Sequence, residues 1–138
     1  MSIEFEDNSE KIKQLLHNAC VDGVTEAGIE ILDQVQKNTK VVTARTKESW
    51  QMDTTETSDS VTSYIGSNYE NAIWEEFGTG EYALHGDGRK GGWFYEDAEG
   101  KGHFTKGKHP RRALHNAFIQ KKIRVLRLIG ENLGRMFE

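Results

Sequence analysis

SEKIKQLLHNACVDGVTEAGIEILDQVQKNTK (residues 9–40) is the stretch that decides the fold class, because it predicts one long helix. Its apolar and small residues recur every three or four positions, which is the pattern of an amphipathic helix: Ile12, Leu16, Ala19, Gly23, Ala27, Ile31 and Val35. Asp7 and Glu10 have the spacing of a capping box at its start. Gly23 and Gly28 disfavour a helix, so they indicate either the close approach of another backbone or a kink.

The periodicity of the sequence changes after this helix. Residues 50–52 (WQM) and 61–66 (VTSYIG) are short, β-rich segments bounded by polar clusters, and they predict two strands. The polar run DTTETSDS (53–60) between them predicts a hairpin loop. Residues 69–77 (YENAIWEEF) predict a short helix with its apolar side chains on one side, and Gly78 follows as a helix-ending glycine.

A glycine-rich segment comes next. Nine of the thirty residues from 78 to 107 are glycine, a density that favours turns and mobile loops over packed elements. Inside this segment, WFY (93–95) and HFT (103–105) flank EDAEGKG (96–102). Two aromatic, β-rich runs around a glycine-containing loop predict a β-hairpin.

A last helix, over about 111–137, follows Pro110, whose fixed φ suits a first helical turn. One apolar stripe on this helix contains six residues: Leu114, Phe118, Val125, Ile129, Leu133 and Met136. Ile119, Ile123 and Leu126 form a second apolar side. The second side indicates either contact with another chain or a wide core face, and both interpretations stay open.

In chain order, these elements predict an α+β fold: a long N-terminal helix, a small antiparallel sheet, a glycine-rich hairpin arm and a long C-terminal helix. The 138 residues fit one domain, 1–138, with the arm at about 78–108. The acidic start MSIEFEDNSEKIKQ lacks the regions of a signal peptide, and no apolar stretch approaches the ~20 residues of a membrane span. We therefore expect a cytosolic protein without a membrane partner.

The formal net charge of −4 conceals an uneven distribution. Residues 1–69 contain 12 acidic and 6 basic residues, whereas residues 101–127 contain nine Lys or Arg and no acid. A basic block of this kind contacts either phosphate or an acidic patch on a neighbouring subunit. A small nucleic-acid-binding accessory protein that uses 101–127 is therefore the alternative function, and a steep loss of DNA affinity with salt would identify it.

Residues that could carry out catalysis or bind a metal do not form a recognisable set. The five histidines lack the close pairing of metal ligands, and the single Cys20 excludes an internal disulfide and a cysteine-rich zinc site. We expect the Cys20 thiol to be buried and inert. GTGEYALHGDGRKGG (78–92) lacks the order of a phosphate-binding loop, and the adjacent Glu75 and Glu76 are interpreted as solvated charge. The sequence predicts no catalytic residue, no metal and no cofactor.

The run YENAIWEEFGTG (69–80) contains a tyrosine-alanine segment that leads into an acidic residue, phenylalanine and GTG. It resembles the neck or tail-completion (head–tail joining) proteins of long-tailed bacteriophages, the family named for gene product ten of a lambdoid phage. RKGGWFYEDAEGKGHFTKG (89–107) is similar to that family's aromatic hairpin, HPRRALHNAF (109–118) to the start of its last helix, and TARTKESW (43–50) to its entry into the first strand. The shared turn comprises these residues: Tyr69, Ala72, Glu76, Phe77, Gly78, Thr79 and Gly80.

The resemblance implies a structural role without catalysis. Subunits of such a family form a ring, with a hexamer as the expected number, at the head–tail junction or the head-proximal end of the tail. The implied partners are other copies of the chain and neighbouring neck and tail proteins, and DNA passes through the ring without sequence-specific contact. The implied location is the virion, after assembly in the cytoplasm of the host bacterium.

Two expectations about particular residues follow. We expect the subunit interface to include the aromatic and basic residues in and after the arm: Trp93, Phe94, Tyr95, Phe104, Lys106, Lys108, Arg111 and Arg112. The alternative is that the hairpin folds onto its own core and buries these aromatic rings. We also expect Phe77 to be buried, with Gly78 or Gly80 at positive φ in the turn.

Overall fold

The computed structural model describes residues 2–39 and 44–138. Position 40, the predicted end of the first helix, and position 43, the start of TARTKESW, lie outside the described residues. The elements are α1 (Ser9–Asn38), α2 (Ala44–Glu48), β1 (Trp50–Glu56), β2 (Val61–Ser67), α3 (Glu70–Phe77), η1 (Gly80–Tyr82), β3 (Trp93–Glu96), β4 (Gly102–Thr105) and α4 (Ala113–Arg135). The predicted α+β fold is confirmed, since two long helices pack together beside two antiparallel hairpins.

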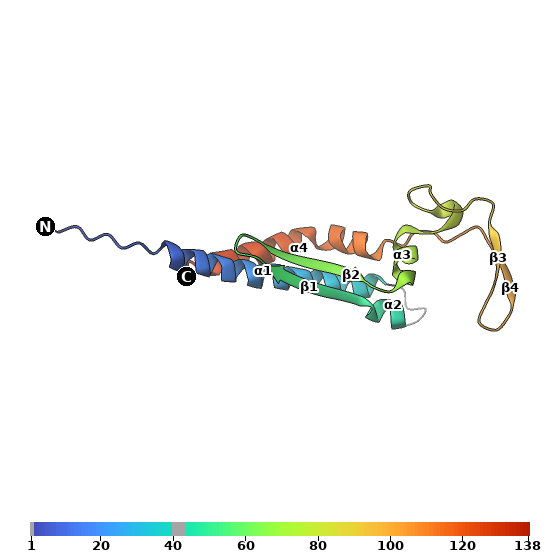
Figure 1. Ribbon diagram of the computed structural model, residues 1–138, viewed down its shortest axis with the longest axis horizontal. Helices are drawn as coiled ribbons and strands as arrows, with labels where there is room; N and C mark the ends of the chain where they lie inside the picture. Colours follow the sequence, from blue (N-terminus) through green and yellow to red (C-terminus); the bar gives the residue numbers. More distant parts are fainter. Residues whose placement is uncertain (1, 40–43) are drawn as a thin grey trace.

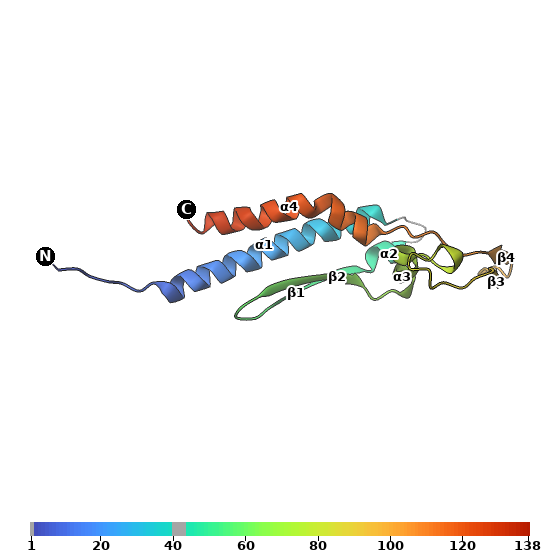
Figure 2. The ribbon, with the colours of Figure 1, turned by 90° about the horizontal axis from the view of Figure 1, so that it is seen from above.

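The elements form an elongated molecule of three layers. Figure 2 shows α1 in the middle, with α4 on one side and the β1–β2 hairpin on the other. Both termini lie toward one end of the long axis, and the β3–β4 hairpin projects at the other end (Figure 1). We call α1, α2, β1, β2, α3 and α4 the body, and residues 78–108 the arm.

The two central glycines of α1 face the two outer layers. A Cβ atom at Gly23 would lie 3.2 Å from the Cα of Ile129 in α4. A Cβ atom at Gly28 would lie 2.5 Å from the sulfur of Met52 and from the hydroxyl of Ser63, in the β1–β2 hairpin. The close approach of another backbone is therefore confirmed at Gly23, whereas Gly28 makes room for side chains, and α1 runs through both positions as one helix.

The hydrophobic core is small and lies where α3 meets the long helices. It consists of Val35, Trp50, Ala72 and Ala117, with partly buried side chains packed around it. Trp50 Nε1 donates a hydrogen bond to the hydroxyl of Thr39 (2.8 Å), which in turn donates to the carbonyl of Val35 (2.7 Å). Most of the buried apolar residues are alanines, so many larger apolar side chains remain at the surface.

The first strand is longer than predicted. β1 continues through Glu56 and pairs with β2 in the register from Trp50↔Ser67 to Glu56↔Val61. The assignment of residues 53–56 to a loop was wrong, because the threonines in this polar run favour a strand. Thr54 also donates a hydrogen bond to Ser63 across the pair (3.2 Å).

The last helix begins later than predicted and does not bury its second apolar side. α4 starts at Ala113, because Arg112 has a left-handed backbone conformation (φ 54°) that does not continue a helix. Ile119, Ile123 and Leu126 are exposed, so the interpretation of a wide core face was wrong.

Candidate functional site

The family-like turn lies where the arm leaves the body. α3 carries Glu75 and Glu76 to the start of α4, and Gly78 ends α3 at a φ of 74°. Gly80 also has a positive φ, of 61°, so the predicted conformation of the turn is confirmed. The site comprises this turn, the residues before α4 and the hairpin that they support.

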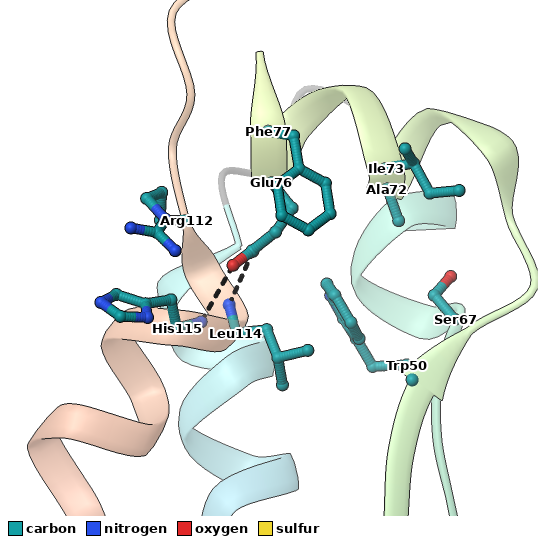
Figure 3. Close-up of a pocket in the computed structure, with 10 residues that line it drawn as sticks. Trp50, Ser67, Ala72, Ile73, Glu76, Phe77, Arg112, Leu114 and His115 are labelled. Atoms are coloured by element: carbon teal, nitrogen blue, oxygen red, sulfur yellow. Dashed lines mark hydrogen bonds between the residues drawn. The ribbon is translucent and has the colours of Figure 1, made fainter. Parts of the chain in front are cut away.

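Glu76 caps α4 from a different element. Its side chain is buried, with 6% of the residue exposed, and one carboxylate oxygen accepts the N–H of Leu114 (2.9 Å) while the other accepts the N–H of His115 (3.0 Å) (Figure 3). First-turn N–H groups have no partner within their own helix, and negative charge is favoured at that end. The interpretation of Glu76 as solvated charge was wrong, because α4 supplies its hydrogen-bond donors.

Glu75 fastens the segment between the arm and α4. Its carboxylate contacts the ammonium of Lys108 and lies 3.1 Å from Nε of Arg111. The backbone carbonyl of Glu75 also accepts the N–H of Arg111 (2.7 Å). Glu75 is therefore an ion-paired side chain rather than a solvated one, and it holds residues 108–111 against α3.

Two short backbone segments lie against each other at the base of the arm. Thr79 N–H donates to the carbonyl of Lys108, and Glu81 N–H donates to the carbonyl of Lys106, both at 2.9 Å. A Cβ atom at Gly80 would lie 2.2 Å from the oxygen of Lys106, and one at Gly107 would lie 2.1 Å from the oxygen of Thr79. Only glycine fits at such distances, so the sequences TGE (79–81) and KGK (106–108) form one unit, which we call the arm root.

Phe77 lies at the edge of the site rather than inside it. The residue is 40% exposed, its ring centroid is 5.6 Å from that of His85, and it lines an open hollow with Trp50 and Leu114 (Figure 3). The expectation that Phe77 is buried was wrong. Ala72 and Glu76, four residues apart on one face of α3, take the buried positions instead.

The predicted hairpin of the arm forms from β3 and β4 and carries aromatic side chains on both faces. Phe94 pairs with Phe104 on one face, with ring centroids 5.0 Å apart, and Tyr95 stacks on His103 on the other (5.2 Å). Phe94, Tyr95 and Phe104 are exposed, and Trp93 lies partly buried with Arg89 above its ring. The hairpin projects from the body (Figure 1), so the interpretation that it folds onto its own core was wrong.

The tip of the hairpin is organised by Asp97. Nε2 of His103 lies 2.8 Å from its carboxylate, and the N–H groups of Lys101 and Glu99 each donate to it at 2.9 Å. The hydrogen bond with His103, and then those from the backbone, lower the pKa of Asp97 below its ordinary value. The hairpin loop therefore favours the ionised form of this carboxyl.

The four basic residues expected at an interface do not form one patch. Lys108 and Arg111 are paired with Glu75 of the same chain. Lys106 belongs to the arm root, and the buried Nε of Arg112 has no hydrogen-bond partner within the described part of the chain. The sequence predicted one basic interface, whereas in the structure Lys108 and Arg111 form ion pairs that hold the base of the arm against α3.

Metal sites and membrane spans require particular arrangements of residues within 2–39 and 44–138, the described part of the chain. In these residues no group of three or more His, Cys, Asp or Glu side chains is arranged to hold a metal ion, and no helix has the length and hydropathy of a membrane span. Cys20 is partly exposed rather than buried as expected.

The carboxylates and glycines of the turn bind backbone and side chains of their own chain, and together they fix a projecting hairpin to a helical body. A family model described as "Bacteriophage HK97-gp10, putative tail-component" matches residues 3–78, which is more than half of the chain. The chain belongs to this HK97 gp10-like family of bacteriophage tail components, and the family resemblance of the sequence is confirmed. Neither a curated protein nor a solved structure matches the chain.

Proposed function

We propose that the chain is a structural virion subunit that assembles into a homo-oligomeric ring, with six copies as the expected number, at the head–tail junction or the head-proximal end of the tail. Residues 1–138 act as one domain, and the arm lies on the adjacent subunit or the next ring. Neighbouring neck and tail proteins are the other partners, and DNA passes through the ring without sequence-specific contact. Assembly takes place in the host cytoplasm.

The observation that carries this proposal is the projecting arm of a tail component. Phe94 of β3 is 81% exposed and lies beside Phe104 of β4. Figure 1 shows β3 and β4 at the end of the molecule far from the termini. Aromatic side chains are favoured anchors in buried interfaces, and glycine-rich backbone is costly to order without contacts. In the proposal, the rings of Trp93, Tyr95 and the Phe94–Phe104 pair insert into a neighbour, while Lys108 and Arg111 hold the root.

The ion pairs of the basic block disfavour the alternative function of nucleic-acid binding. Lys121 and Arg124 of α4 lie 3.4 and 3.7 Å from the carboxylate of Glu30 in α1. With the two bases that Glu75 neutralises, four of the nine basic residues in 101–127 are paired inside the chain. The remaining bases are spread from the hairpin to α4, which does not make a continuous surface for phosphates.

Replacement of residues 90–105 by a short Gly-Ser turn tests the proposal, because it removes the hairpin and keeps the arm root. We expect a folded protein, with a melting temperature within a few degrees of that of the parent, that no longer forms rings and does not rescue particles lacking the subunit. A double variant, Phe94→Asp with Phe104→Asp, serves as the control for loop length and should have the same defect. Normal assembly by either variant, or unfolding of the isolated deletion variant, would contradict the role given to the arm.

A further inference from the structure

The outer face of α4 is an apolar surface without a partner in its own chain. Ile119, Ile123 and Leu126 are 59%, 73% and 63% exposed. Their spacing along the helix places them on one side, opposite the buried Ala117 and Leu128 that face α1. Contiguous exposed apolar surface, unlike single scattered residues, is typical of binding surfaces.

Two glycines continue this row toward the end of α4. Gly130 and Gly134 fall on the same side of the helix as Ile123, and a Cβ atom at either position would meet nothing within 4 Å. Glycine disfavours a helix interior, and neither residue has the tight neighbour that explains Gly23. A segment of another molecule that lies close to the backbone of α4 would explain why both positions are glycine.

The chain also contains an extended segment whose side chains match this surface. Residues 2–8 precede α1 without helix or strand structure, and Ile3 and Phe5 are 92% and 91% exposed. In an extended chain, alternate residues point to the same side and lie about 6.6 Å apart, close to the ~6 Å between residues four apart on a helix. Ile3 and Phe5 therefore have the spacing to pack on Ile119 and Ile123.

The charges on the two surfaces are complementary. Lys122 and Arg127 lie on opposite sides of the apolar row, and neither has an acidic partner among the described residues. Residues 2–8 are acidic, with Glu4, Glu6 and Asp7. In an extended segment, Glu4 and Glu6 point to the side opposite Ile3 and Phe5, so their charge acts on the flanking bases by attraction at a distance rather than by direct ion pairs. A contact between the α4 helices of two copies would instead bring like charges together, which is unfavourable.

Residues 2–8 cannot reach the row from Ile119 to Leu126 of their own chain. Gly23 packs against Ile129, and Ser9 lies 14 residues before Gly23, about 21 Å along α1. Because the helices are antiparallel (Figure 2), Ile123 lies about 9 Å farther in the opposite direction. The separation of about 30 Å exceeds the ~14 Å that four extended residues between Ser9 and Phe5 can span.

We propose that residues 2–8 of one copy bind the outer face of α4 on a neighbouring copy. Ile3 and Phe5 pack on the row from Ile119 to Leu126, and the negative charge of residues 2–8 is attracted to the flanking Lys122 and Arg127. The contact joins two different surfaces, so it can be repeated from copy to copy around a ring. It rests on the proposed self-association of the subunit but does not involve the arm.

A binding measurement with a labelled peptide of residues 1–10 tests this contact without requiring a ring. The receptor is the full chain with Ile3→Asp and Phe5→Asp, so that its own tails do not occupy the site. We expect saturable binding by fluorescence anisotropy, and a loss of affinity of at least about tenfold when the receptor also carries Ile123→Asp. Addition of Tyr64→Asp, which removes an exposed aromatic side chain from β2 instead, should leave the affinity unchanged.

Charge reversal gives a second, independent test of the contact. Receptor variants Lys122→Glu and Arg127→Glu, combined, should bind the peptide roughly threefold or more weakly, and a peptide with Glu4→Lys and Glu6→Lys should recover the affinity. Absent peptide binding, or equal binding by the Ile123→Asp receptor, would overturn the tail contact and leave the arm proposal intact. Self-association of the Ile3→Asp, Phe5→Asp chain through Ile123 would show an α4–α4 contact and would also overturn it. Peptide binding by a chain that never forms rings would contradict the proposed function alone.

Discussion

In the body, Gly23 and Gly28 let three layers approach until their backbones or side chains touch. In the arm, Gly78 and Gly80 take positive φ values and let a turn pass against a second loop. Glycine therefore allows close packing of elements in the body, whereas in the arm it allows the backbone to turn. The body buries Trp50 in its core, whereas the arm leaves the rings of Phe94 and Phe104 exposed, so substitutions at these positions should differ in their effect on the free energy of unfolding.

The largest difference in the free energy of unfolding is expected between alanine substitutions at Trp50, in the body, and at Phe94, in the arm. Trp50→Ala removes the largest buried side chain of the core and its hydrogen bond to Thr39, and should lower the free energy of unfolding by about 3–5 kcal/mol. Phe94→Ala removes an exposed ring and should change it by less than about 0.5 kcal/mol. Urea denaturation of the isolated subunit measures both values. Equal losses for the two variants would mean that the arm belongs to the core.

Glu76 connects the two regions, and its replacement should have the next largest effect. Glu76→Ala leaves two N–H groups of α4 without their carboxylate acceptor and should cost roughly 1.5–3 kcal/mol. The amides of Leu114 and His115 should also exchange their hydrogens faster. Glu70→Ala, at an exposed position in the first turn of the same helix, is the control and should cost less than about 1 kcal/mol. Equal stability of the two variants would show that Glu76 is not the cap of α4.

Replacement of two glycines of the body by leucine should change the free energy of unfolding in opposite directions. Gly23→Leu places a side chain where even a Cβ lies 3.2 Å from Ile129, and should destabilise the subunit by about 1–3 kcal/mol. Gly130→Leu enters open space on α4 and should stabilise it by up to about 1 kcal/mol through helix propensity. Thermal unfolding of both variants gives the signs directly. A stabilising Gly23→Leu would disprove the close contact between α1 and α4.

The smallest effect is expected at the tip of the arm and depends on pH. The pKa of Asp97 is lowered from 3.8 by hydrogen bonds from His103 and the loop backbone, so these bonds stabilise the hairpin above about pH 4. That stabilisation is lost as the pH falls through the lower pKa of the folded hairpin. Chemical shifts of the loop amides should follow this titration while those of the core do not. Asp97→Asn should abolish the pH dependence, and a persistent transition would assign it to another group.

Local patterns were sufficient to predict the elements that depend on local chemistry. The apolar stripe of α1, the glycine that ends α3 and the aromatic runs of the β3–β4 hairpin each contain their signal within a few residues. Patterns of this kind predict an element but not what lies opposite it. For this reason the sequence left open whether Gly23 marked a contact or a kink, and the position of Ile129 decided the question.

The errors at the site have a common cause in contacts between distant parts of the chain. Glu76 is separated by 38 residues from the N–H of Leu114, so nothing near it in the sequence indicates a cap. Phe77 is the more apolar residue, yet α3 turns Glu76 inward and leaves Phe77 at the edge of the hollow (Figure 3). Arg112 breaks the start of α4 through its backbone conformation, which an arginine seldom adopts.

The pairing of the first and last helices also sets the order of events while the protein is being synthesised. Glu26 and Asn132 are hydrogen-bonded across 106 residues, so α1 has no partner for its small-residue face until the ribosome has released α4. At bacterial elongation rates of about 5–20 residues per second, this delay is roughly 5–20 s. The β3–β4 hairpin, whose strands are separated by five residues, forms within microseconds. The strands of the hairpin can therefore pair during synthesis before α1 and α4 pack together, although an isolated two-stranded hairpin is only marginally stable.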